Sequence, residues 1–132
     1  YYIRGQYSTA SFAYNQLRNL KWITDIDRYF YYVNYLVCLK YTDKEELNNQ
    51  LVKWKTSTDA PIFKIAKQLI KNDYANINNM IKNIFISNEE YYNLSDEECS
   101  FYLIKGFIKE WPLFKDYRET EYYKSLCEEL HL

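Results

Sequence analysis

The chain has 132 residues, and its 17 Lys and Arg residues nearly balance its 18 Asp and Glu residues, so the formal net charge at pH 7 is −1. This near neutrality argues against a strong electrostatic nucleic-acid binder, which usually carries a basic excess or a basic stripe. Only two glycines and two prolines are present, which argues against an all-β sandwich or barrel with its many tight turns. We therefore expect an all-α protein.

The first three expected helices follow from apolar periodicity and from capping residues. A helix is predicted over residues 8–20, with one shared face formed by Phe12, Ala13, Gln16, Leu17 and Leu20. Thr24 is expected to cap the next helix, over residues 26–40, whose apolar stripe is broad enough to be covered on more than one side. Thr42 and Glu45 form a capping-box pattern that opens a third helix.

The remaining helices follow from further capping signals. Pro61 is expected just inside a fourth helix that ends at Asn72-Asp73, and a fifth is predicted over residues 74–85. Capping-box patterns occur at Ser87 and Ser95, and the second is followed by a predicted helix over 96–108. Pro112 is expected to begin a short helix through residue 118, and Thr120 to cap the last one, to about residue 130. The total is about seven helices.

A similar helical phrase occurs three times, as Asn15-Gln16-Leu17, Asn49-Gln50-Leu51 and Asn79-Met80-Ile81, with offsets of 34 and 30 residues. Periods of this size are typical of stacked antiparallel helix pairs. We therefore predict one helical domain over residues 1–132. It would be a short tetratricopeptide-like (TPR-like) solenoid over about 8–86, with a helical C-terminal cap over about 87–132. Because the first residue is Tyr1 and not Met, we expect a fragment of a longer protein.

Side chains suited to catalysis or metal binding are sparse. The single histidine, His131, is next to the last residue, where chains usually fray. The three cysteines are far apart and form no Cys-x-x-Cys pair, so we expect reduced thiols packed as small hydrophobic residues. Paired glutamates fall at expected helix starts or on a terminal turn, where they suit the helix dipole or stay solvated. We predict no catalytic residue, no cofactor, no metal site and no enzymatic activity.

Aromatic residues are the strongest functional candidates. Tyr29, Phe30, Tyr31 and Tyr32 are consecutive, so on a helix some of them must face solvent or a partner. Tyrosine is favoured at interfaces because it offers a rigid apolar area with a polar tip. Three interpretations remain open: a crowded core, a partner-binding face, or stacking of single-stranded nucleic acid helped by Arg28 and Lys40. The expected partner-binding residues are Trp22, Tyr31, Tyr32, Tyr35 and Trp54.

A family resemblance rests on several segments between residues 33 and 130. The most specific is Trp111-Pro112-Leu113-Phe114-Lys115 followed by Tyr117-Arg118; others are Asn34-Tyr35, Ser57-Thr58-Asp59, Phe63-Lys64-Ile65-Ala66 and Asn72-Asp73-Tyr74. The chain resembles the C-terminal TPR-like helical-repeat segment of large bacterial proteins. The resemblance implies a cytosolic scaffold attached to an upstream effector or enzymatic domain, in a defence or stress system.

The expected function is a non-catalytic protein–protein interaction or scaffold module that binds a protein partner or an upstream domain of the same protein. The alternative is a nucleic-acid-associated accessory helical domain of a defence nuclease or regulator. No membrane partner is expected, because the longest apolar-looking stretch, residues 29–39, is about half of a membrane span and contains Asn34. The expected location is cytoplasmic.

Overall fold

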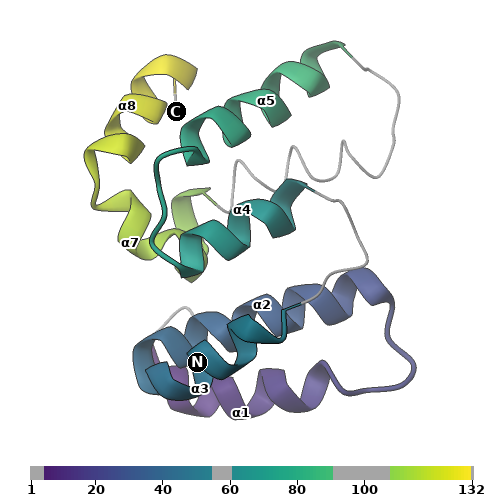
Figure 1. The fold of residues 1–132 in the computed structure, drawn as a ribbon. Coiled ribbons are helices and arrows are strands. Elements are labelled where there is room, and N and C mark those ends of the chain that lie inside the picture. Colours follow the sequence, from purple (N-terminus) through teal and green to yellow (C-terminus); the bar gives the residue numbers. More distant parts are fainter. Residues whose placement is uncertain (1–4, 55–60, 91–107, 132) are drawn as a thin grey trace. The chain divides into compact units, whose positions relative to one another are not determined.

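The computed structural model describes residues 5–54, 61–90 and 108–131, and within those ranges the protein is all-α, with no strand. This confirms the predicted class and fits the expected number of helices. The chain divides into two compact units, which are described separately (Figure 1): unit 1 is Tyr1–Thr58 and unit 2 is Asp59–Leu132. The prediction of one repeat domain over the whole chain stays a prediction.

Unit 1 contains three described helices, α1 (Tyr7–Leu17), α2 (Asp25–Thr42) and α3 (Lys44–Val52), and α2 contacts both of the others (Figure 1). The middle of α2 supplies most of the core because five consecutive side chains there are buried. The buried side chains of unit 1 are those of Ala10, Val33, Tyr35, Leu36, Val37, Cys38, Leu39, Leu47 and Trp54.

Side-chain caps fix the starts of α2 and α3. The Thr24 hydroxyl accepts a hydrogen bond from the Asp27 N–H at 3.2 Å, which confirms the predicted cap of α2. The predicted cap of α3 is wrong by one residue. Thr42 lies in the last turn of α2, where its hydroxyl donates to the Cys38 carbonyl at 2.8 Å. Asp43 caps α3 instead, because its carboxylate accepts from the Glu46 N–H at 3.1 Å and suits the positive end of the helix dipole.

The predicted face of α1 is also wrong. The Phe12 side chain is 70% exposed, and Ala13 and Gln16 are exposed as well. The face that packs on α2 instead carries Ala10, which is buried, and the half-buried Tyr7 and Tyr14. The prediction followed Phe and Leu, whereas α2 presents tyrosine rings that stack on tyrosine rings of α1.

Unit 2 contains α4 (Pro61–Ile70), α5 (Ile77–Glu90), the 3₁₀ helix η1 (Pro112–Phe114), α7 (Lys115–Arg118) and α8 (Glu121–Leu130) (Figure 1). The helix α4 contacts α5 and η1, and α5 contacts α8. These contacts enclose a separate apolar core. Its buried side chains are those of Phe63, Ile65, Ala66, Leu69, Ile70, Ile77, Ile81, Ile108, Trp111, Leu113, Phe114, Tyr117 and Leu126.

The predicted end of α4 is confirmed. Asn72 has a left-handed backbone with φ of 57°, its N–H donates to the Leu69 carbonyl, and the Asp73 N–H donates to the Gln68 carbonyl at 2.9 Å. This is a Schellman ending with asparagine in the place that glycine usually takes. The helix α5 then begins at Ile77, three residues later than expected.

The predicted end of the fifth helix, at about residue 85, is too early, because α5 continues through Glu90. The capping-box pattern at Ser87 therefore lies inside α5. The predicted helix over 96–108 lies outside the described residues except for its last position. Pro112 does begin a short helix, and the Thr120 hydroxyl accepts from the Tyr123 N–H at 3.4 Å, so both of these predictions are confirmed.

The three similar phrases fall in α1, α3 and α5 but occupy different environments. Leu17 and Leu51 are half-buried, whereas Ile81 is fully buried. The stacking of helix pairs into a solenoid therefore stays a prediction. In the described part of the chain, no helix combines the length and the apolar character needed to cross a membrane.

Candidate functional site

The five residues expected to bind a partner lie in three different environments of unit 1. Trp22, between α1 and α2, is 81% exposed. Tyr31 and Tyr32 are half-buried on α2, and Tyr35 and Trp54 are each only 9% exposed. The structure therefore brings Tyr32, Tyr35 and Trp54 together in a cluster and leaves Trp22 in solvent. Partner binding by these residues stays a prediction.

The cluster is organised around Arg18, the residue that follows the last residue of α1. Its guanidinium carbon Cζ lies 5.0 Å from the ring centroid of Tyr32 and 5.2 Å from that of Tyr35. Both distances are within the range at which a cation is attracted to an aromatic face. The Arg18 Nε donates a hydrogen bond to Asn15 Oδ1 at 2.9 Å, which orients the guanidinium.

The Tyr32 side chain also contacts α3 and the residues after it. Its ring centroid lies 5.3 Å from that of Trp54, and its hydroxyl donates to Gln50 Oε1 at 3.1 Å. The Gln50 amide in turn donates to Glu46 Oε1 at 2.8 Å. Burial raises the pKa of Tyr32, an effect that the Arg18 charge partly offsets, so the phenol stays neutral at pH 7.

Two further ring pairs join α1 to α2. The Tyr7 and Tyr41 rings are stacked with centroids 4.6 Å apart, and the Tyr14 and Tyr31 rings are stacked at 6.3 Å. Tyr31 is therefore already engaged with a ring of its own unit. These pairs stabilise the packing of α1 on α2 by about 0.5–1.5 kcal/mol each beyond the area that they bury.

Arg28 fixes the segment that carries Trp22. Its Nη1 donates to the Arg18 carbonyl at 2.6 Å, and its Nη2 donates to the Leu20 carbonyl at 2.8 Å. A cation at the carbonyl end of α1 also suits the negative end of the helix dipole. Lys40, the other cation considered for nucleic-acid binding, lies 5.8 Å from the Tyr41 ring centroid.

Sequence reasoning missed Arg18, Asn15 and Gln50 as parts of the cluster. The signals that could have found them are local pairs, namely Asn15 with Arg18 at i,i+3 and Glu46 with Gln50 at i,i+4 on predicted helices. These pairs meet Tyr32 only through the packing of three helices, which local sequence patterns do not predict.

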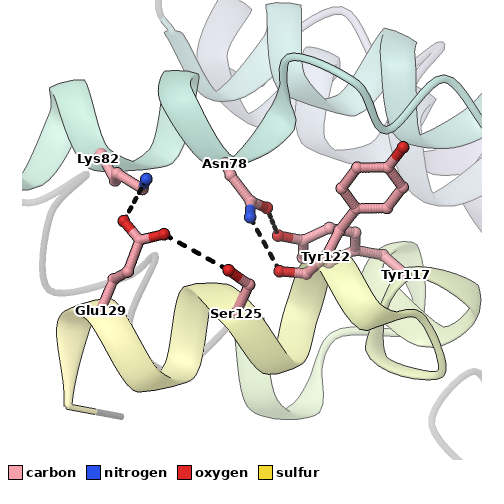
Figure 2. Close-up of polar contacts among 6 residues, drawn as sticks. All are labelled: Asn78, Lys82, Tyr117, Tyr122, Ser125 and Glu129. Atoms are coloured by element: carbon pink, nitrogen blue, oxygen red, sulfur yellow. Dashed lines mark hydrogen bonds and ion pairs between the residues drawn. The ribbon is translucent and has the colours of Figure 1, made fainter.

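Unit 2 holds a polar cluster between α5, α7 and α8 (Figure 2). The Tyr117 hydroxyl donates to Asn78 Oδ1, and the Asn78 amide donates to the Tyr122 carbonyl at 2.9 Å. The Lys82 ammonium pairs with Glu129, which also accepts from the Ser125 hydroxyl at 3.4 Å. The Lys82 ammonium and the Ser125 hydroxyl hold the pKa of the Glu129 carboxyl below its usual range. This cluster connects helices of one unit.

The pKa shifts of Cys38, which is fully buried, and of Tyr74, which is half-buried, favour their neutral forms. Burial raises the pKa of the Cys38 thiol from 9.0 to about 12 and that of the Tyr74 phenol from 10.0 to about 12, the latter with a smaller contribution from Asp116. An activated nucleophile shows the opposite shift. Within the described residues, no group of three or more His, Cys, Asp or Glu side chains is arranged to hold a metal ion.

Comparison with protein-family models, with curated proteins and with solved structures gives no match to this chain.

Proposed function

We propose that this chain is a non-catalytic protein–protein interaction module in which Trp22 anchors a protein partner. The observation that carries the proposal is the 81% exposure of the Trp22 side chain. Tryptophan is among the residues most enriched at the energetic centres of interfaces. Burying such a side chain in a partner would contribute about 2 kcal/mol.

The backbone around Trp22 supports this role because it is held in place before a partner arrives. The Arg28 guanidinium binds the carbonyls of Arg18 and Leu20, and the Asn19 and Leu20 N–H groups donate to the Gln16 and Leu17 carbonyls. An anchor on a fixed segment loses less conformational freedom on binding than one on a loose loop.

The partner class follows from the same surface and from the family resemblance. We propose a protein, or an upstream domain of the same protein, that meets this module in the cytoplasm. The alternative, a nucleic-acid-associated accessory domain, gains little from Arg28 and Arg118, since Arg28 binds backbone carbonyls and Arg118 donates to the Ile108 and Trp111 carbonyls at 3.0 Å.

The experiment first places a photo-crosslinking amino acid at position 22 of the full chain in cells and identifies the protein that is crosslinked. Calorimetry then measures the affinity of that protein for the unchanged chain and for its variants. We expect Trp22→Ala to weaken binding at least tenfold. The matched control is Val52→Ala, since Val52 is 88% exposed on α3 and is expected to change the affinity less than twofold. Equal affinities for the two variants would contradict the proposal. Binding to nucleic acid that falls steeply with salt would support the alternative.

A further inference from the structure

The contact of Arg18 with Tyr32 and Tyr35 has the chemistry of a cation-binding site. The two tyrosines are three residues apart on α2, so their side chains lie on the same side of that helix. The guanidinium of Arg18 comes from the end of α1 and lies about equally far from both ring centroids, at 5.0 and 5.2 Å. Such faces recognise cationic ligands in other proteins.

The charges around the two rings also favour a cation. Burial is the largest cause of the raised pKa of both phenols, and the Arg18 charge lowers the pKa of both. The Glu46 carboxylate raises the pKa of both phenols, and the Asp43 carboxylate raises that of Tyr35. Tyr32 is held by its hydrogen bond to Gln50, and its ring lies against Trp54. Aromatic faces and carboxylates are therefore both present before any external ligand is considered.

Arg18 is held by few bonds and is not fully enclosed. Its Nε donates to Asn15, but no described residue accepts a hydrogen bond from its Nη1 or Nη2. Both Arg18 and Tyr32 are only half-buried. By contrast, Arg28 uses Nη1 and Nη2 on two different carbonyls. For an external cation to take its place, Arg18 therefore has to give up one side-chain hydrogen bond and two ring contacts.

We propose that the rings of Tyr32 and Tyr35, which both lie against the Arg18 guanidinium, form a guanidinium-binding site, which Arg18 fills within the chain and which takes the arginine side chain of a partner protein when Arg18 leaves. This site is separate from Trp22 and goes beyond the proposed function. The planar guanidinium suits it better than an ammonium, because a flat cation can lie against aromatic faces while its edges donate hydrogen bonds.

The test uses Arg18→Ala in the full chain and the guanidinium ion, at low millimolar non-denaturing concentrations, as the probe. We expect saturable NMR shifts of the Tyr32 and Tyr35 ring signals in the variant, with binding at least tenfold weaker in the unchanged protein. The matched control is Arg28→Ala, in which the same two rings should show no saturable shift. Absence of saturable shifts in Arg18→Ala, or equal binding in the unchanged protein, would overturn the proposal.

A second variant covers the case in which Arg18→Ala does not fold. Arg18→Gln keeps a side-chain donor for Asn15 but removes the guanidinium, and we expect low millimolar guanidinium to raise its melting temperature. Adding Tyr32→Leu to this variant should abolish that rise. If guanidinium lowers the melting temperature of Arg18→Gln, or stabilises the double variant equally, the two rings are not the site.

Discussion

Tyr117 and Asn78 are joined by a hydrogen bond that links two segments far apart in the sequence: the Tyr117 hydroxyl on α7 donates to Asn78 Oδ1 on α5 (Figure 2). The same Asn78 side chain donates to the Tyr122 carbonyl at 2.9 Å, so one amide joins α5 to the α7–α8 region. Tyr117 is fully buried, and its ring packs against those of Tyr74, Phe114 and Tyr123. Loss of this bond should therefore affect all of unit 2.

Tyr117→Phe keeps the ring and removes the donor. We expect unit 2 to lose about 1–3 kcal/mol in its free energy of unfolding, because Asn78 Oδ1 is left without this donor beside a buried ring. The measurement is a urea titration followed by the NMR indole N–H signal of Trp111, which is buried in this unit. Tyr122→Phe is the matched control; since Tyr122 contributes its backbone carbonyl to the network, a loss below about 0.5 kcal/mol is expected. Equal losses in the two variants would show that the hydroxyl of Tyr117 is unimportant.

Arg28→Ala removes both hydrogen bonds that hold the segment carrying Trp22. We expect unit 1 to lose about 1–2 kcal/mol of stability, because the two carbonyls at the end of α1 lose a charged donor. Amide hydrogen exchange should also accelerate in residues 19–24 more than in α3. Lys21→Ala, a change at an exposed neighbouring cation, is the control and should alter neither quantity. Unchanged exchange in Arg28→Ala would argue against a held anchor segment.

Stability should fall in alkaline solution because buried phenols resist ionisation. The unfolded chain releases the Tyr74 proton near the ordinary pKa of 10.0, whereas the folded chain holds it to about 12. The folded state binds more protons in that range, so stability is complete below pH 10 and falls as the pH rises toward 12. Burial shifts the pKa of Tyr117 in the same direction. Alkaline titration of Tyr74→Phe should show a shallower loss in unit 2; an unchanged slope would contradict this assignment.

The cysteines should differ in reactivity. Cys38 is fully buried with a pKa raised to about 12, whereas Cys127 is only half-buried on α8. Because the thiolate is the reactive form, we expect a thiol reagent at pH 8 to label Cys38 at least about a hundredfold more slowly than Cys127. Mass spectrometry of labelled peptides measures both rates. In denaturing urea the two rates should converge, and comparable rates in the folded protein would place Cys38 outside the core.

Local signals in the sequence predicted several parts of the fold. Thr24 and Thr120 cap helices as expected, since a hydroxyl at the start of an amphipathic run has a nearby N–H to accept from. Asn72 ends α4 because asparagine tolerates the left-handed conformation. All of these depend on residues within a few positions of each other.

The errors in the predicted fold and site arose where packing between helices decides which side chains are buried. Phe12 is a large apolar side chain of α1 but is exposed, whereas the tyrosine rings of α2 stack on Tyr7 and Tyr14. The aromatic candidates were found by residue type. Residue type does not predict that Trp22 is exposed and Trp54 is buried, because this difference depends on how α1, α2 and α3 pack. Arg18 was missed for the same reason.

The most direct test of the account is hydroxyl-radical footprinting of aromatic side chains in the unchanged full chain, alone and in complex with the partner that crosslinking identifies. The account predicts rapid oxidation of Trp22 and Phe12, slow oxidation of Tyr35, Trp54 and Tyr117, and protection of Trp22 when the partner is bound. Oxidation of Trp54 and Tyr35 as fast as that of Trp22 would contradict the described core. An unprotected Trp22 in the complex would contradict its role as the anchor.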